Sequence, residues 1–283
     1  GPAMSHIVAV HGVGNHTPGY SPEKIAADRG AVWAGQLAAG LGAEPAAVDL
    51  TFAYYAHQLR TGTPTAQGGA DSALDHLGPD ETRAIAQWVD ALALPQATAQ
   101  GRLAVPLRAA VDLVARRFSL DGRLTRLFVA TFFREVTTYL SGPDAPVRTA
   151  AREQVASVIR AHRPSVVIAH SLGTVVTYEA LHAHPDLQID LLLTLGSPLA
   201  LPHAVFHQLQ PTPRDSQGIR PPGVGRWVNI ADHGDPIAVL RPLKAYFPGI
   251  DLDLTESTGL FRLHGAAGYL GSAATAAAVA PYL

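Results

Sequence analysis

Residues 166–174 read Val-Val-Ile-Ala-His-Ser-Leu-Gly-Thr, and this stretch decides the fold. Its first four residues are apolar and mostly β-branched, which is typical of a strand buried on both faces of a parallel sheet. A helical pattern begins directly after Ser171. A serine on so tight a strand-to-helix turn has its hydroxyl exposed above the carboxyl edge of the sheet, where it can attack a substrate. The small residues Ala169 and Gly173 would let the two backbones pack closely at this turn.

A second interpretation of Ser171 is that it only caps the following helix, since Ser is common at the N-cap. A capping serine does not need small residues on both sides, so the pattern favours a nucleophile. The usual form of this motif is G-x-S-x-G, and here Ala169 replaces the first Gly, which adds one methyl group. The helix beginning at Leu172 would point its free N–H groups and the positive end of its dipole at the site, which favours a developing oxyanion.

Strands alternate with helices on both sides of this stretch. Strands are expected at 7–10, 48–54, 190–195 and 226–230, and helices at 28–41, 145–161 and 172–182. Strand, helix and strand at the N-terminal spacing indicate a βαβ unit. We therefore predict an α/β fold with a mostly parallel central sheet flanked by helices, in a single domain that covers residues 4–283.

A segment with a different pattern separates the second expected strand from the central one. Residues 58–80 are polar and rich in Gly, Thr and Ala, which predicts a long loop, and three amphipathic helical stripes follow. This is more helix than one crossover connection needs. We therefore expect a loop and helical lid inserted over residues 58–143. Residues 208–225 contain four prolines and predict another loop.

A nucleophilic serine needs a base, and the base needs an acid to orient it, in the chain order Ser, Asp or Glu, His for this kind of turn. Asp232 and Asp235 both follow an expected strand, and either could be a turn carboxylate instead. We favour Asp235, because Pro236 fixes the turn that would aim it. His264 stands between an expected last strand and the final helix, where a triad histidine must lie, although a lone His is more often structural.

Two backbone N–H groups must also face the developing oxyanion. One comes from Leu172, the residue after the nucleophile, and the other from a Gly-rich loop after an earlier strand. The turn His11-Gly12-Val13-Gly14 follows the first expected strand. Val13 would supply the second donor, or Gly14 if the loop is shifted by one residue.

These four elements, in this order, resemble the lipase/esterase branch of the α/β-hydrolase superfamily. The sequence matches further at Thr194-Leu195-Gly196-Ser197-Pro198, at Asp235-Pro236-Ile237 and at Tyr269-Leu270 after His264. The resemblance covers nearly the whole chain except roughly 58–134 and 208–225. A few lipases of the superfamily also carry Ala in place of the first Gly of the serine motif.

The resemblance implies an α/β-hydrolase fold and the transfer of an ester or thioester acyl group to water through an acyl-enzyme. It implies Ser171 as nucleophile, Asp235 as acid and His264 as base, with Val13 and Leu172 as oxyanion donors. It does not imply a particular substrate, because one fold carries many functions.

Composition argues against several other classes of protein. Lys and Arg number 21 against 23 Asp and Glu, so the net charge of −2 does not fit a nucleic-acid partner. Cys is absent, which excludes disulfides, a thiolate nucleophile and thiolate metal sites, and gives no sign of an oxidising compartment. We therefore expect a cytoplasmic protein.

The two ends of the chain fit that expectation. Residues 1–3 before Met4 resemble the remnant of a cleaved expression tag, and the apolar run that follows begins too soon for a signal peptide. Residues 265–283 are apolar but consist mostly of small residues, which favours a packed helix over stable membrane insertion.

Metal and cofactor sites have weak support. Most of the 13 histidines are expected to be surface groups or to lie outside the site, although His11, His16 and His233 could gather near the sheet edge. Gly12-Val13-Gly14 is not the G-x-G-x-x-G of a dinucleotide site. We expect neither a metal nor a cofactor.

The aromatic residues of the expected insertion bear on the substrate. Phe128 and Phe132 lie on one helical stripe beside the expected site, and either could pack in the core or line an acyl pocket. We expect a hydrophobic ester as the small-molecule partner. A thioesterase, an acyltransferase or a macrocycle-forming enzyme would use the same triad, and a hydrolase fold can also serve as a non-catalytic binding protein.

Overall fold

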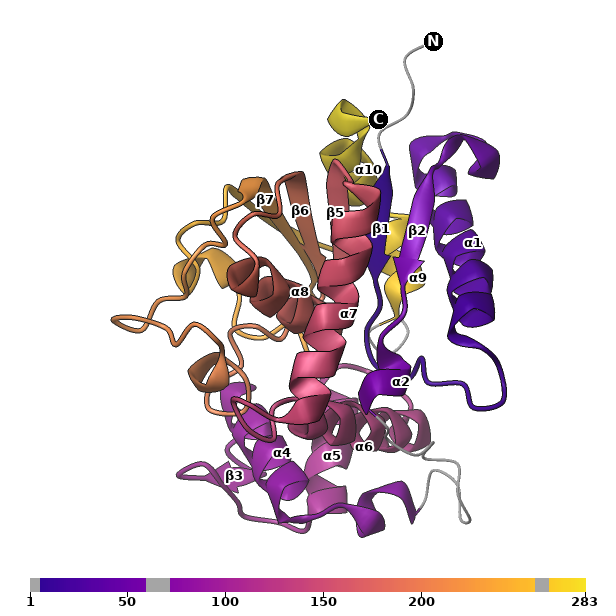
Figure 1. Ribbon diagram of the computed structural model, residues 1–283. Coiled ribbons are helices and arrows are strands. Elements are labelled where there is room, and N and C mark those ends of the chain that lie inside the picture. The colour runs from indigo at the N-terminus through magenta and orange to yellow at the C-terminus, as the bar shows by residue number, and fades with distance from the viewer. Residues whose placement is uncertain (1–5, 60–71, 258–264) are drawn as a thin grey trace.

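The computed structural model describes residues 6–59, 72–257 and 265–283, and its centre is a parallel sheet (Figure 1). The sheet has six strands in the order β2-β1-β5-β6-β7-β8, and every neighbouring pair is parallel. The strands are β1 (Ile7–Val10), β2 (Leu50–Ala53), β5 (Val166–His170), β6 (Ile189–Leu195), β7 (Val224–Asp232) and β8 (Leu252–Glu256). The predicted α/β architecture with a parallel central sheet is confirmed.

The strand order creates a switch point between β1 and β5. The chain moves outward from β1 to β2, returns to β5 on the other side of β1, and then moves outward again to β8. Connections that leave two neighbouring strands in opposite directions open a crevice at their carboxyl ends. Val10 and Ala169 are register partners, so the Gly-rich turn after β1 lies beside the serine turn after β5.

Helices cover both faces of the sheet. One face carries α1 (Pro22–Leu41), α9 (Ala266–Leu270) and α10 (Ala273–Val279), and the other carries α7 (Pro146–His162) and α8 (Leu172–Ala183). Alternate residues of β1 face the two sides: Ile7 packs in the cluster that contains Trp33 of α1, and Val8 packs in the cluster that contains Val155 of α7. The expected C-terminal helix is broken into two, and Gly271 between them lies against Gly40 of α1.

A mainly helical segment between β2 and β5 lies beyond the carboxyl ends of the strands, at the foot of Figure 1. It contains α2 (Ala56–Leu59), η2 (Ala73–His76), α4 (Pro79–Ala91), β3 (Thr98–Ala99), β4 (Arg102–Leu103), α5 (Leu107–Arg117) and α6 (Gly122–Tyr139). The three expected amphipathic stripes are α4, α5 and α6, whereas the β3–β4 hairpin was not predicted. The loop expected over 58–80 is shorter at both ends, because α2 extends to Leu59 and η2 begins at Ala73; residues 60–71 lie outside the described part.

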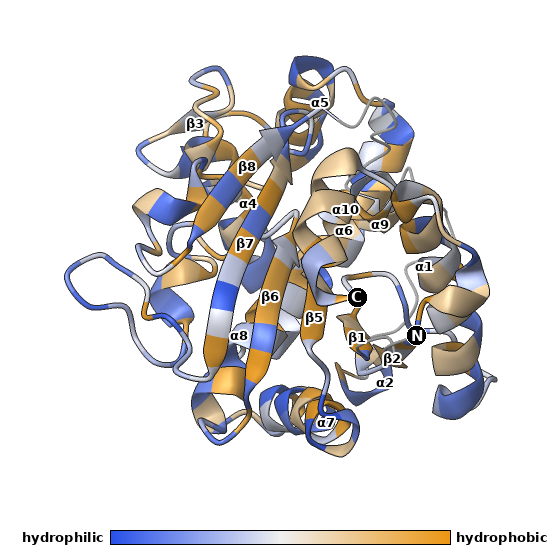
Figure 2. Cartoon of the chain, turned by 90° about the horizontal axis from the view of Figure 1, so that it is seen from above, coloured by the Kyte–Doolittle hydropathy of each residue, from blue (hydrophilic) through white to orange (hydrophobic). Residues whose placement is uncertain are grey.

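Hydropathy follows the position of each strand in the sheet (Figure 2). All five residues of β5 are buried, and β5 and the neighbouring β6 are mostly hydrophobic. The outer strand β8 alternates between hydrophobic and hydrophilic residues and buries none of them fully. Polar residues on an edge strand discourage pairing with another chain. Short 3₁₀ helices complete the chain at Pro45–Ala47, Phe206–Gln208, Leu243–Ala245 and Ala280–Tyr282.

A buried ion pair joins α7 to α8. Arg148 donates to both carboxylate oxygens of Glu179, at 2.9 and 2.5 Å, and both side chains are at most 1% exposed. Tyr139 at the end of α6 donates to Glu179 at 2.6 Å, and the Gln210 backbone N–H donates to it at 2.8 Å. Burial and the nearby Glu179 charge raise the pKa of Tyr139 well above its usual value, so its hydroxyl stays a donor. The network therefore fixes α6 and the 208–210 segment against the two helices.

We predict that Glu179→Ala lowers the free energy of unfolding by about 3–5 kcal/mol, because Arg148 would keep an unpaired buried charge. The matched control is Asp186→Asn: Asp186 pairs with Arg160 between α7 and the segment after α8, but at the surface. That variant should unfold almost like the unmodified protein. Urea unfolding measures both, and equal losses for the two variants would contradict the prediction.

Candidate active site

The backbone of Ser171 is strained. Its φ of 57° and ψ of −129° lie in a region that residues other than Gly rarely adopt, at a cost of about 1–3 kcal/mol. The turn is held by three hydrogen bonds: Ser171 N–H donates to Leu195 O at 3.1 Å, and Ser171 O accepts from Thr174 N at 3.0 Å and Thr174 Oγ1 at 2.7 Å. Ser171 is 0% exposed, so the exposed hydroxyl expected from the sequence is wrong for this structure, and its Oγ has no hydrogen-bond partner among the described residues.

Two glycines make room for this turn. A Cβ on Gly12 would lie 2.5 Å from Ser171 Cβ, and a Cβ on Gly173 would overlap the carbonyl oxygen of His11. The turns after β1 and β5 are therefore packed backbone against backbone, as the small residues of the sequence indicated. The methyl group of Ala169, which departs from the usual motif, is fully buried in the core instead.

His11 holds the Gly-rich turn in place and is not a base. It is fully buried and stacks on the Tyr55 ring, with 4.1 Å between ring centroids. Its Nε2 accepts the Tyr55 N–H at 3.1 Å, so the proton is on Nδ1 and is donated to Gly12 O at 2.7 Å. Burial lowers the pKa of His11 to about 3, which keeps the ring neutral. Tyr55 Oη in turn donates to His11 O at 2.9 Å.

Asn15 and Arg29 brace the same turn from the side of α1. Asn15 Nδ2 donates to Gly12 O at 3.1 Å and to Val13 O at 3.2 Å. The Arg29 guanidinium donates to Asn15 Oδ1 at 2.6 Å and to Thr17 Oγ1 at 3.2 Å. The amide oxygen of Asn15 is thereby fixed, and its NH₂ group is directed at the two carbonyls.

The two sequence candidates for the second oxyanion donor differ in their partners. Gly14 N–H donates to Glu135 Oε2 of α6 at 2.7 Å. No acceptor among the described residues takes the N–H of Val13 or of Leu172. Between Val13 and Gly14, which the sequence left open, Val13 is therefore the one whose N–H is not already used.

Both candidate acids are buried after β7. Asp235 is 0% exposed; its Oδ1 accepts the Ile237 N–H at 2.9 Å, and its Oδ2 accepts from Tyr269 Oη at 2.6 Å. Asp232 is 3% exposed, and its Oδ1 accepts the Gly234 N–H at 2.7 Å. Each aspartate thus closes a local turn, and Asp235 also receives a bond from a distant helix.

Tyr269 of α9 connects the acid turn to the serine turn. Its hydroxyl donates to Asp235 and accepts the Asp232 N–H at 2.9 Å. Burial and the Asp235 charge raise the pKa of Tyr269 well above its usual value, so it remains a donor. Its ring lies 5.9 Å from that of His170, the neighbour of Ser171. The structure therefore brings the turns after β1, β5 and β7 to one edge of the sheet.

Two contacts hold the acid turn in place, and the sequence did not predict either of them. Trp88 of α4 donates its indole N–H to Pro236 O at 2.7 Å. The Arg241 guanidinium donates to Asp232 O at 3.0 Å and to Asp235 O at 3.3 Å. A buried Trp usually has an acceptor for its N–H, so the sequence could indicate that Trp88 has a partner but not that the partner is Pro236.

A pocket of about 310 Å³ lies beside these turns. Its lining combines Val13 and His170 of the two turns with residues of α1, α6 and the start of α9. The lining residues are Val13, Asn15, Arg29, Val32, Trp33, Gln36, Phe128, His170, Gly265, Ala266 and Ala267. Val32 is 54% exposed, an unusual position for a large apolar side chain next to a buried Trp.

The two phenylalanines selected from the sequence have different positions. Phe128 is half-buried and lines this pocket. Phe132 is 0% exposed and packs in the core behind it, 5.8 Å from Phe128 and 5.0 Å from Phe133 between ring centroids. Both residues lie on the same stripe of α6, so their spacing in the sequence could not tell which of them reaches the pocket.

His264, the expected base, lies outside the described residues, which break off at 257 and resume at 265. Gly265, the next residue along the chain, lines the pocket with Val13 and His170. Within the described ranges, no group of three or more His, Asp or Glu side chains is placed to hold a metal ion. The same ranges contain no helix with the length and apolar character needed to span a membrane.

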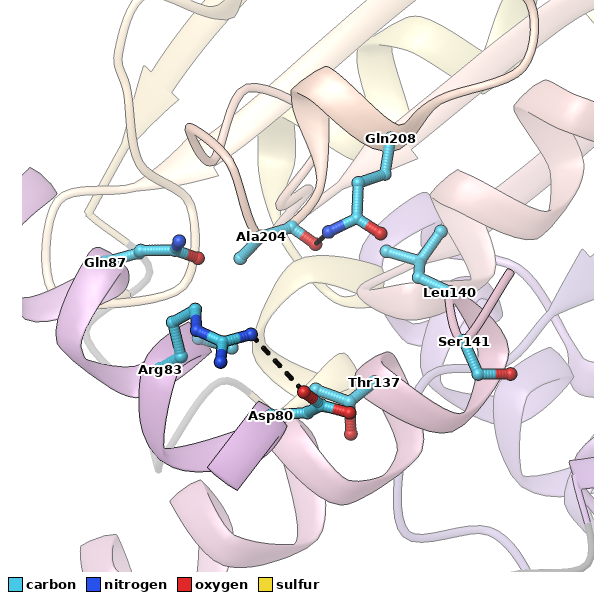
Figure 3. Close-up of a pocket in the computed structure, with 9 residues that line it drawn as sticks. Asp80, Arg83, Gln87, Thr137, Leu140, Ser141, Ala204 and Gln208 are labelled. Atoms are coloured by element: carbon cyan, nitrogen blue, oxygen red, sulfur yellow. Dashed lines mark hydrogen bonds and ion pairs between the residues drawn. The ribbon is translucent and has the colours of Figure 1, made fainter. Parts of the chain in front are cut away.

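A second cavity, of about 230 Å³, lies between α4, the end of α6 and the 204–208 segment (Figure 3). Its charged residues, Asp80 and Arg83, pair with each other at 3.3 Å and are exposed. It shares no lining residue with the pocket that Val13 and His170 line. Nothing in this cavity suggests a separate reaction.

Comparisons of the chain with protein-family models, with curated proteins and with solved structures find no match. A function must therefore be argued from the geometry of the site.

We predict that Gly173→Ala lowers the free energy of unfolding by about 1–3 kcal/mol, because the added methyl group overlaps the His11 carbonyl and the turn must shift. Gly35→Ala in α1 is the control: nothing lies within 4 Å of its Cβ position, so a gain of up to about 1 kcal/mol is expected. Urea unfolding of both variants measures the difference. A Gly173→Ala protein as stable as Gly35→Ala would show that the two turns are not tightly packed.

Proposed function

We propose that this chain is a serine hydrolase with an α/β-hydrolase fold that cleaves carboxylic ester bonds of hydrophobic, lipid-like substrates. The observation that carries the proposal is the conformation of Ser171: a strained, non-glycine residue at the switch point of the sheet, whose buried hydroxyl has no hydrogen-bond partner among the described residues. Strain of this kind persists where function requires it. Most buried hydroxyl groups in proteins form a hydrogen bond.

In the proposed reaction, Ser171 Oγ attacks the ester carbonyl and its proton passes to His264. The alcohol leaves with that proton, and water then releases the acid from the acyl-enzyme by the same route. The oxyanion would be held by the N–H groups of Val13 and Leu172, which are not used elsewhere in the described structure. Leu172 is also the first residue of α8, so the helix dipole favours the negative charge.

Asp235 is the proposed acid, with Asp232 as the alternative. Its side chain is held on both oxygens, by the local Ile237 N–H and by the Tyr269 hydroxyl of the distant helix α9. Tyr269 also lies five residues after His264 in the chain, which supports a histidine from that segment as the partner of Asp235. The base itself is proposed on chain order and on the position of Gly265 at the pocket.

The pocket supports an apolar acyl group as its occupant. Val32, Trp33 and Phe128 form an apolar wall beside the proposed oxyanion donor Val13. Because Ser171 is 0% exposed, a substrate can reach it only if part of the covering structure moves. We propose that α4, α5 and α6 form a lid that makes this movement.

We predict that a fluorophosphonate probe labels the protein and that Ser171→Ala abolishes the labelling, because only an activated serine reacts at a useful rate. Labelling should be much reduced in His264→Ala and strongly reduced in Asp235→Asn. Intact-protein mass spectrometry measures the adduct, and Asp232→Asn is the control for the acid. If Asp232→Asn is the crippled variant, the acid assignment is wrong; if the unmodified protein is not labelled, the proposed function is wrong.

The substrate class is tested with p-nitrophenyl esters from acetate to octanoate. We predict that kcat/KM rises with chain length, by up to about fourfold for each CH₂ group buried, since burial contributes about 0.8 kcal/mol per group. Phe128→Ala should flatten this rise. Leu124→Ala, at an exposed position of the same helix, should leave it intact. A flat profile in the unmodified protein would contradict an apolar acyl pocket.

A further inference from the structure

Glu135 is a buried acid that the proposed reaction does not use. It lies on α6 and is 5% exposed, and no described residue forms an ion pair with it. Its Oε2 accepts the backbone N–H of Gly14 at 2.7 Å, which joins two residues 121 positions apart in the sequence. A buried carboxyl is costly unless it is bonded, so this placement calls for an explanation.

The Val13–Gly14 peptide group is hydrogen-bonded at both its N–H and its carbonyl oxygen, and Glu135 accepts the N–H. The Val13–Gly14 peptide presents its carbonyl to Asn15 Nδ2 at 3.2 Å and its N–H to Glu135 at 2.7 Å. Gly14 has a φ of 78°, and because glycine lacks a Cβ its backbone could adopt many other conformations if either bond were lost. The neighbouring N–H is that of Val13, for which no described residue is an acceptor.

We propose that Glu135 is a positioning residue for the oxyanion site: its carboxylate holds the Val13–Gly14 peptide from α6, so that Val13 N–H faces the reacting carbonyl. This inference depends on the proposed function. Because α6 belongs to the proposed lid, the contact also couples closure of the lid to assembly of the oxyanion site. A substrate-bound, closed enzyme would then have the donor in place, and an open one would not.

The contact depends on pH. Burial raises the pKa of Glu135 to about 7, although the Gly14 N–H and Arg134 act in the opposite direction. Above that pH the carboxylate is ionised and accepts the Gly14 N–H strongly; below it the neutral acid is a weaker acceptor. The hold on the peptide is therefore lost as the pH falls through about 7.

The effect of Glu135 on the pH dependence must be distinguished from the effects of other ionisable groups around it. Arg134 on α6 and Tyr54 and Tyr55 after β2 interact with Glu135 electrostatically. The histidines of the neighbouring segments are His57 on α2, His11 in the Gly-rich turn and His16 just after that turn. Charged residues of the helices that pack on α6 include the ion pairs Asp80–Arg83, Asp112–Arg126 and Arg148–Glu179, and Asp75 and His76 of η2 are exposed. Burial raises the pKa of both tyrosines and lowers that of His11 to about 3, so these three keep one charge state near pH 7.

The test is the rate constant for fluorophosphonate labelling of Ser171 between about pH 5 and pH 9, in the unmodified protein, Glu135→Gln and Glu135→Ala. Protonation of the base stops labelling, and protonation of Glu135 lowers the rate further, by up to about tenfold, so the acid limb of the unmodified protein should be steeper than a slope of 1 near pH 7 on a logarithmic plot. Glu135→Gln mimics the protonated acid, so its rate near pH 8 should already be several-fold lower and its acid limb should keep a slope of 1 throughout. Glu135→Ala should lose roughly tenfold near pH 8, because the donor is no longer held.

Exposed Glu44, between α1 and β2, supplies the control variant Glu44→Gln, which should behave like the unmodified protein. His57 and His16 are the same in all variants and cancel in the comparison. If Glu135→Ala fails to fold, the acid-limb slope of Glu135→Gln still tests the inference. Labelling of the unmodified protein with an unchanged slope in Glu135→Gln overturns this inference alone, whereas no labelling at all overturns the proposed function.

Discussion

The rest of the site depends on how closely the turn after β1 approaches the turn after β5. These strands are register partners at the switch point of the sheet, so their chains leave in opposite directions from adjacent positions. Gly12 and Gly173 let the two backbones touch, and this contact keeps Ser171 in a conformation that costs about 1–3 kcal/mol. A Cβ on either glycine would force the turns apart, and the Ser171 hydroxyl would move with them.

Among the described residues, Glu135 and Trp88 of the helical segment between β2 and β5 form polar contacts with this edge of the sheet. Glu135 of α6 binds the Gly-rich turn, and Trp88 of α4 binds the turn that carries Asp235. Each contact joins a side chain of the segment to a backbone group of a loop beyond the sheet. Movement of these helices would therefore loosen both sides of the site together, which links access to Ser171 with the order of the groups around it.

Burial sets the protonation state of the groups that position the site. His11 is kept neutral and can donate at one ring nitrogen while it accepts at the other. Tyr269 is kept protonated and donates to Asp235. In both, the low-dielectric surroundings that disfavour the charged form also strengthen the hydrogen bonds. Glu135 differs, because burial brings its pKa to about 7, where it can change charge.

The sequence by itself determined the parallel α/β core, the turn at Ser171 and the three helices before α7. Each of these follows from a local sequence pattern: the run of apolar residues in β5, the small residues beside Ser171, and the apolar residues at helical spacing before α7. It also supplied His264 as the expected base, which stays a prediction. Only the tertiary structure decided that Gly14 N–H and not Val13 N–H has an acceptor among the described residues, that Phe128 and not Phe132 lines the pocket, and that Glu135 and Trp88 hold the two turns. Those contacts join residues 121 and 148 positions apart, and no local pattern encodes a partner at that distance.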